Sequence, residues 1–147
     1  MTHFIHQVFI PFHLVDAAGI LFFSHAFTLA HQAFENFVIE GLHLKWETWF
    51  QNSNWGVPIK QAEADYCKPL LAGQPCLIKL CVEEIRSSSF VMGYQFDQEE
   101  NTCCKLKIAH VFCDQKTRQK IPIPIEILPF LKKYCFQLTA ENLLPHK

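Results

Sequence analysis

A surplus of positive charge is missing from this chain of 147 residues. Its 13 Lys and Arg residues are balanced by 14 Asp and Glu residues, so the formal net charge is −1. Proteins that hold a nucleic-acid backbone need clustered cations, so this balance disfavours nucleic acid as a partner. No apolar run approaches the roughly 18 residues of a membrane helix, so we expect no membrane span.

A disulfide framework is also missing. The 7 Cys residues are an odd number without a CxxC pair, and Cys103 and Cys104 are adjacent. We therefore predict free thiols in a reducing cytoplasm, with Cys67 among the buried ones. The N-terminal stretch MTHFIHQVFIPF has no basic region followed by a small-residue cleavage site, so we expect no signal peptide.

The chain is rich in apolar residues, because 50% of it is hydrophobic and 14 residues are Phe. This composition predicts one domain over residues 1–147 with an aromatic core. A strand is predicted over 6–12 and a long helix over 24–42. Ser24 is a suitable N-cap whose hydroxyl accepts a backbone N–H, and Gly41 is a suitable helix end. The apolar stripe of this helix comprises Phe27, Ala30, Phe34, Phe37 and Val38.

From residue 57 onward the pattern changes to alternation of apolar and polar residues. A strand is predicted over 56–69, two strands over 74–98 around a turn at Arg86–Ser88, and a strand over 101–115. Short helices are predicted over 44–52, with Trp46, Trp49 and Phe50 facing inward, and at the end of 121–135. The tail from about residue 137 is expected to be weakly ordered. The fold class is therefore α+β, with one long helix covering one face of an antiparallel sheet.

The stretch VDAAGILFF, residues 15–23, places a single acid, Asp16, among apolar residues. Gly19 allows the backbone to turn between this acid and the helix start. One interpretation is that Asp16 is a turn residue whose carboxylate bonds its own loop. The other is that the turn brings the carboxylate to the helix start for chemistry.

The local sequence alone favours the turn interpretation, but the helix start would give the carboxylate a chemical use. The N–H groups of about Phe23, Ser24 and His25 have no partner within the helix and create positive potential. They would polarise a substrate carbonyl and stabilise the developing oxyanion, typically by about 3 kcal/mol per donor. Asp16 on the opposite side would attack that carbonyl or activate a water molecule. This arrangement suits acyl transfer.

The same residues resemble a known family. Hotdog-fold acyl-CoA thioesterases of the 4-hydroxybenzoyl-CoA thioesterase type carry Asp-x-Ala-Gly-(Ile/Val)-(Val/Leu)-aromatic-aromatic before a long helix. The segment from Asp16 to Phe23 fills this pattern without a gap. Later matches are Pro58, Ala64, Pro69, Gly73 and Ser89–Phe90. The helix stretch HQAFE, residues 31–35, is similar to the branch that acts on 1,4-dihydroxy-2-naphthoyl-CoA in phylloquinone or menaquinone synthesis.

The resemblance implies a hotdog fold, in which a five- or six-stranded antiparallel sheet wraps a long central helix. It implies an acyl-CoA substrate, no metal or other cofactor, and a homodimer or homotetramer with its active site at a subunit interface. Asp16 would be the catalytic nucleophile or general base, and the N–H groups of Phe23 and Ser24 would polarise the thioester. The substrate-binding residues would be Gly19, His25 and Pro58. CoA would bind at Arg86, Ser87 and Ser88, with Lys116, Arg118 or Lys120 as alternative phosphate contacts.

Some alternatives stay open from the sequence. His25 either contacts substrate or is a capping or solvent-facing residue, and His31 is expected to be a packed or interface residue bonded to Glu35. His3 and His6 lack further ligands at a suitable spacing, so no metal site is predicted. The chain as a whole is an aryl-CoA thioesterase, a thioesterase for another acyl-CoA, or a non-catalytic hotdog dimer. The sequence does not specify the acyl group.

Overall fold

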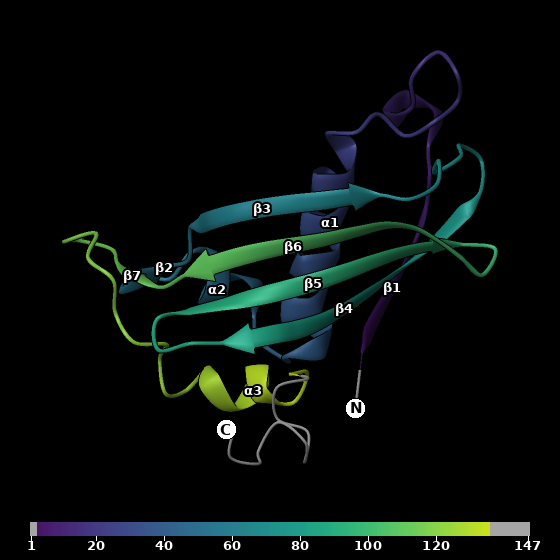
Figure 1. Cartoon of the computed structure of the whole chain (residues 1–147). Coiled ribbons are helices and arrows are strands. Elements are labelled where there is room, and N and C mark those ends of the chain that lie inside the picture. Colours follow the sequence, from purple (N-terminus) through teal and green to yellow (C-terminus); the bar gives the residue numbers. More distant parts are fainter. Residues whose placement is uncertain (1–2, 136–147) are drawn as a thin grey trace, which may run out of the picture.

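The structure is a computed structural model that describes residues 3–135, so the predicted weak order of the tail lies outside the described part. A five-stranded antiparallel sheet curves around one long helix, which is the expected hotdog arrangement (Figure 1). The strands follow the order β1-β4-β5-β6-β3 and are β1 (Phe4–Phe9), β3 (Ile59–Tyr66), β4 (Pro75–Ile85), β5 (Ser89–Gln98) and β6 (Asn101–Val111).

The remaining elements are short. A separate two-stranded sheet joins β2 (Trp55–Gly56) to β7 (Cys113–Asp114). The helices are a 3₁₀ turn (Phe12–Leu14), α1 (His25–Asn36), a π-helical segment (Phe37–Gly41), α2 (Trp46–Phe50) and α3 (Leu128–Lys132). Within residues 3–135, no helix is both long and apolar enough to cross a membrane. The predicted order of strand, long helix and antiparallel strands is confirmed.

The long helix begins after Ser24 and continues through the π-helical segment to Gly41, as predicted. The last turn is wide because the Leu42 N–H bonds the Phe37 carbonyl at 2.9 Å. The prediction that the Ser24 hydroxyl caps the helix is wrong. Ser24 has helical dihedral angles (φ −69°, ψ −23°), whereas a capping side chain requires an extended residue.

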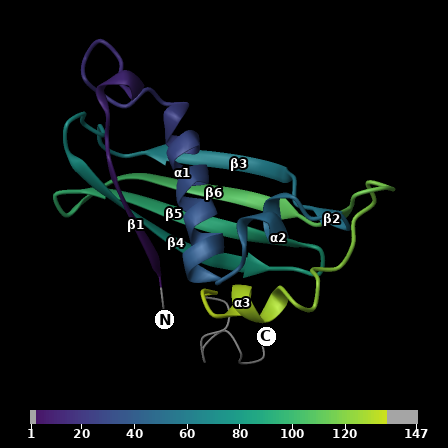
Figure 2. The same ribbon diagram turned by 180° about the vertical axis from the view of Figure 1, so that it is seen from behind.

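Figure 2 shows α1 crossing the strands on one face of the sheet, and small residues on the helix are packed there. Ala26, Ala30 and Ala33 are fully buried, and of the predicted stripe only Phe27 stays partly exposed. The prediction for Trp46 is wrong, since 36% of this residue is exposed and its indole N–H donates to Glu35 at 2.9 Å. Trp49, also predicted to face inward, is buried, and Phe50 is partly buried.

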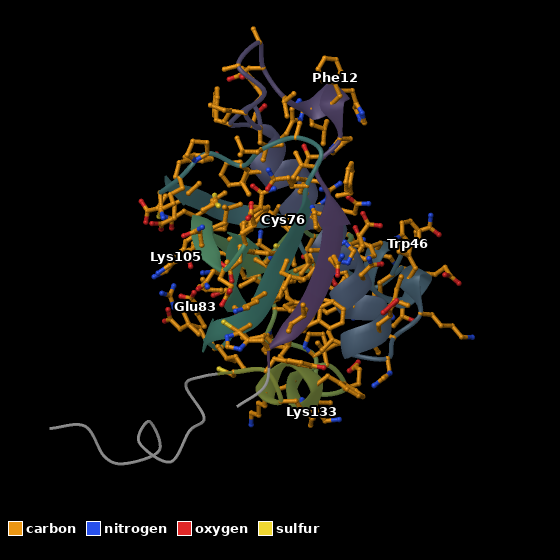
Figure 3. The ribbon with its side chains drawn as sticks, turned by 90° about the vertical axis from the view of Figure 1, so that its right-hand side faces the viewer. Phe12, Trp46, Cys76, Glu83, Lys105 and Lys133 are labelled. Atoms are coloured by element: carbon orange, nitrogen blue, oxygen red, sulfur yellow. The ribbon has the colours of Figure 1, made fainter. Side chains whose placement is uncertain are left out.

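The outer face of the sheet is polar. Lys79 pairs with Asp97 at 3.2 Å and Lys107 with Glu83 at 3.4 Å. Figure 3 shows Glu83 on this side and Trp46 on the opposite side. Alternate residues of β6 face inward and are buried, as period-2 patterning requires. Cys76, Cys81 and Cys135 are buried as predicted, whereas Cys113 is only partly buried and Cys67 is exposed just beyond the end of β3.

Candidate active site

The loop over residues 10–23 crosses one end of the sheet and leads into α1 (Figures 1 and 2). It is tied to the segment before β4 by backbone hydrogen bonds. The Leu21 N–H donates to the Leu70 carbonyl at 2.8 Å, and the Ala72 N–H donates to the Gly19 carbonyl at 3.2 Å. The loop conformation is therefore held by residues far along the chain.

Asp16 sits in a tight turn within this loop. Its Oδ1 atom accepts hydrogen bonds from the N–H groups of Ala18 at 2.9 Å and Ile20 at 3.2 Å. Gly19 closes the turn with φ +80°, a conformation that favours glycine. Oδ2 receives no hydrogen bond from any residue in 3–135, and the side chain is exposed. The turn interpretation thus holds for one oxygen, and the second oxygen is available for chemistry.

The helix start presents two backbone donors without acceptors. Within the described chain, the N–H groups of Phe23 and Ser24 make no hydrogen bond. The His25 N–H, by contrast, donates to the Phe22 carbonyl at 2.9 Å, so its predicted role as a third donor is wrong. The His25 ring packs against Phe22 with a centroid separation of 6.0 Å. Two amides therefore remain to polarise a carbonyl.

Tyr66, at the end of β3, fixes the backbone that carries these amides. Its hydroxyl donates to the Phe23 carbonyl at 2.5 Å. Burial raises the pKa of Tyr66, so the hydroxyl stays a donor at neutral pH. Sequence reasoning did not identify Tyr66, because no local pattern links a strand end to a loop 43 residues earlier.

A surface cavity of about 410 Å³ brings these groups together, and we call it the Asp16 cavity. It is lined by Asp16, Ile20, Leu21, Phe22, Phe23, Tyr66, Cys67, Lys68, Pro69 and Leu70. Apolar side chains dominate, and Asp16 and Lys68 are its two charged members. A carbonyl bound in this cavity would share it with the Asp16 carboxylate and with Phe23, whose amide begins the pair of free donors at the helix start. That combination can transfer an acyl group.

Pro58, predicted to bind substrate, lies in a different cavity at the start of β3. This second cavity, of about 350 Å³, is lined by His31, Phe34, Trp49, Phe50, Gly56, Val57, Pro58, Ile59, His110 and Gln115. We call it the His110 cavity. His31 pairs with Glu35 at 3.5 Å, as predicted. Because β3 separates the two cavities, one protomer does not bring Pro58 to Asp16.

The residues predicted to bind CoA form the turn between β4 and β5. Figure 1 shows this turn at the opposite end of the sheet from the Asp16 loop. Arg86 donates to both carboxylate oxygens of Glu84, at 2.6 and 3.1 Å, which lowers the pKa of Glu84. The carbonyls of Ser87 and Ser88 accept hydrogen bonds from the chain that follows β6. The turn is therefore engaged within its own protomer.

The alternative phosphate contacts lie in the exposed loop after β7. Lys116, Arg118 and Lys120 form no ion pair with any residue in the described part of the chain. Asp114 shapes this loop by accepting the N–H groups of Lys116 and Thr117 at 2.9 and 2.8 Å, which lowers the pKa of Asp114. Three cations are thus displayed that make no ion pair within residues 3–135.

His110 is the second residue that sequence reasoning missed. It occupies an inward position of β6 and is only 2% exposed. A sequence signal for its burial was present, because period-2 alternation in KLKIAHVF aligns His110 with the buried Leu106 and Ile108.

Residues 3–135 contain no group of three or more His, Cys, Asp or Glu side chains that could hold a metal ion.

Comparison with known proteins places this geometry in context. A family model described as the thioesterase-like superfamily matches residues 10–131. A 1,4-dihydroxy-2-naphthoyl-CoA hydrolase from Crocosphaera subtropica is 31% identical over 127 residues, covering 84% of this chain and 91% of that protein. A hydrolase of the same name from Acaryochloris marina is 27% identical over 127 residues, covering 84% and 92%. The crystal structure of a 1,4-dihydroxy-2-naphthoyl-CoA thioesterase from Synechocystis shares the fold, with a TM-score of 0.81 at 20% identity over 89% of this chain and 96% of that chain.

Proposed function

The chain belongs to the thioesterase-like superfamily, and we propose that it hydrolyses an aromatic acyl-CoA thioester, with 1,4-dihydroxy-2-naphthoyl-CoA as the substrate. The observation that carries the reaction type is the Asp16 cavity, which is lined by both Asp16 and Phe23. Within residues 3–135, Asp16 Oδ2 and the amides of Phe23 and of the adjoining Ser24 make no hydrogen bond. The acyl group is taken from the names of the relatives from Crocosphaera and Acaryochloris. The place of the reaction would be phylloquinone or menaquinone synthesis.

In the proposed reaction the thioester carbonyl oxygen accepts hydrogen bonds from the amides of Phe23 and Ser24. Charge that develops on this oxygen in the tetrahedral transition state is stabilised by these fixed dipoles at the helix start. In one route, Asp16 Oδ2 attacks the carbonyl, the C–S bond breaks, CoA thiolate leaves, and water hydrolyses the resulting mixed anhydride. In the other, Asp16 takes a proton from a water molecule that attacks directly.

We further propose a homodimer formed through the free edge of β3. Every residue of this strand except Ala64 is exposed, and both Ile59 and Tyr66, at its two ends, are 48% exposed. A free edge strand carrying apolar residues is a template for pairing with a second copy. A two-fold axis through β3 would pair the two copies antiparallel.

Antiparallel pairing has a direct consequence for the site. The start of β3 lines the His110 cavity and its end lines the Asp16 cavity. The two-fold axis therefore places the His110 cavity of one protomer beside the Asp16 cavity of the other. Thioester cleavage would occur at Asp16, and the aromatic acyl group would enter the cavity of the neighbouring subunit, which includes Pro58.

The same geometry favours the loop after β7 as the phosphate-binding element. This loop adjoins the His110 cavity, since Gln115 lines that cavity. Lys116, Arg118 and Lys120 make no ion pair in the described part of the chain, whereas Arg86 is paired with Glu84. In the dimer these cations would lie on the side of the neighbour's Asp16 and would contact the CoA phosphates.

A thioesterase panel tests the function. 1,4-Dihydroxy-2-naphthoyl-, 4-hydroxybenzoyl-, phenylacetyl- and long-chain acyl-CoA are compared by kcat/KM, and the naphthoyl thioester is expected to rank first. Asp16→Asn should lower kcat by at least about a hundredfold with little change in folding or CoA binding, because it removes the reacting oxygen but keeps the side-chain shape. Glu47→Gln, an exposed acid on α2, is the matched control. A preference for fatty acyl chains, or an unaffected Asp16→Asn enzyme, would contradict the proposal.

Oxygen-18 water separates the two routes. In a single turnover by the nucleophilic route, labelled water attacks the Asp16 carbonyl carbon of the mixed anhydride. The label then remains in the Asp16 carboxylate. General-base catalysis places label in the product acid alone. Mass spectrometry of the peptide that contains Asp16 provides the readout.

Complementation tests the shared site. Asp16→Asn and His31→Trp, which fills the His110 cavity, are each expected to be inactive. Co-refolding them in equal amounts should restore about a quarter of the wild-type activity, because half of the dimers are mixed and each has one intact composite site. No recovery would mean that Asp16 and the acyl cavity act within one subunit. Sedimentation velocity confirms that the two variants assemble.

A further inference from the structure

The imidazole of His110 is buried and carries a nitrogen atom to which residues 3–135 supply no hydrogen-bond partner. The residue is 2% exposed, and its Nε2 atom has no hydrogen-bond partner in the described chain. Buried polar side chains in folded proteins almost always have a partner, because an unpaired buried group loses its hydration without compensation. An inward position on β6 would accept an apolar residue at lower cost, as Leu106 and Ile108 show.

The ring is also held in a fixed orientation. It lies between Phe34 and Phe90, stacked on both, with centroid separations of 4.8 and 4.9 Å and interplanar angles of 16° and 8°. Only the edge of the imidazole, which carries its two nitrogen atoms and its C–H groups, can meet a further group. Because His110 lines the cavity at the start of β3, a ligand in that cavity can reach this edge.

The charge state of His110 defines which ligand groups fit. Burial, with a smaller contribution from His31, lowers the pKa of His110 to about 3. The neutral ring has one N–H donor and one acceptor nitrogen. A phenolic hydroxyl can donate or accept and matches either atom. A ligand carboxylate would find no positive charge on this ring, because the imidazole is neutral.

Resting on the function proposed above, we propose that His110 is the specificity-determining residue of the acyl cavity and hydrogen-bonds a hydroxyl group on the aromatic ring of the substrate. The substrate class is therefore hydroxyaryl thioesters rather than aryl thioesters in general. His31 lines the same cavity but is half-exposed and paired with Glu35, so it does not require a ligand partner. Apolar Phe34, Trp49 and Phe50 would contact the carbon frame of the acyl group.

The test compares substrates with and without the hydroxyl groups. kcat/KM is measured for 1,4-dihydroxy-2-naphthoyl-CoA and 2-naphthoyl-CoA, and for 4-hydroxybenzoyl-CoA and benzoyl-CoA. We define the hydroxyl factor of each pair as kcat/KM for the hydroxylated substrate divided by kcat/KM for the substrate without hydroxyl groups. Comparing this factor between wild type and a variant cancels the intrinsic effect of the hydroxyl on thioester reactivity. His110→Phe keeps an aromatic ring in the stack, and His110→Gln keeps a donor and an acceptor. His6→Phe is the matched control, since the Nε2 of His6 is also buried and unpaired but His6 does not line this cavity.

For at least one substrate pair, the hydroxyl factor should fall by about 10- to 100-fold in His110→Phe, because an unmade hydrogen bond to a buried group carries a penalty of this size. It should fall less in His110→Gln and stay at the wild-type value in His6→Phe. An unchanged hydroxyl factor in a folded His110→Phe enzyme that still turns over would overturn the inference and leave the thioesterase function intact.

A binding measurement separates this inference from the proposed function. The free acids, 1,4-dihydroxy-2-naphthoate and 2-naphthoate, are titrated calorimetrically into wild type and His110→Phe. A wild-type preference for the hydroxylated acid that disappears in the variant supports the role of His110 even if no thioester is hydrolysed. Equal discrimination by both proteins overturns it. Circular dichroism confirms the folding of each variant.

Discussion

Acid sensitivity of the fold is the sharpest physical consequence of the buried His110. Its pKa of about 3 in the folded protein lies below the ordinary value of 6.5, with desolvation as the main cause. Below pH 6.5 the unfolded chain binds a proton at this site that the folded chain does not bind. The free energy of unfolding therefore falls as the pH falls, through a window from 6.5 down to about 3.

The magnitude follows from the two pKa values. Between about pH 7.5 and about pH 5, His110 alone should remove about 2 kcal/mol from the free energy of unfolding. The pKa of His6 is also lowered by burial and adds a loss of the same sign. The lowered pKa values of Glu84 and Asp114 act mainly at lower pH, since their ordinary values are 4.5 and 3.8. Comparison with His110→Phe cancels these shared contributions.

Urea unfolding at one protein concentration provides the assay. When the pH falls from about 7.5 to about 5, the free energy of unfolding of wild type should decrease by about 2 kcal/mol more than that of His110→Phe. This difference does not depend on the stability of the variant at neutral pH. NMR of the imidazole nitrogens should show a neutral ring in the folded protein at about pH 5. Equal losses in the two proteins would refute the reasoning, because His110 would then titrate alike in the folded and unfolded states.

Two further predictions concern the active site. Tyr66→Phe should lower kcat by about threefold to tenfold with KM almost unchanged, because the Phe23 carbonyl loses the hydroxyl that positions the helix start. Steady-state kinetics checks this, and a rise in KM by the same factor would contradict a positioning role. Replacing Lys116, Arg118 and Lys120 together by Ala should raise KM for the CoA thioester by about tenfold without lowering kcat, and the difference should shrink at high salt. An unchanged KM at low ionic strength would exclude this loop as the phosphate site.

Local patterns were enough for much of the fold. Alternation located the β4–β5 hairpin and its turn at Arg86–Ser88, and the apolar stripe located α1 and the π-helical segment after it, which ends at Gly41. These features depend on neighbours in sequence, through backbone geometry and side-chain periodicity. The Ser24 cap failed because the preceding turn, closed by the bond from the His25 N–H to the Phe22 carbonyl, gives Ser24 a helical conformation.

The Asp16 turn and the helix that follows it depend on residues close together in the chain, because Gly19 permits the positive φ and the carboxylate bonds amides two and four residues away. The groups that surround this turn depend on packing between distant segments. Tyr66 reaches Phe23 across 43 residues, and Pro58 lies in another cavity because β3 separates the two sites. The aromatic stack around His110 likewise joins α1, β5 and β6. Such contacts depend on how helix and strands pack in space, and no spacing along the chain encodes them.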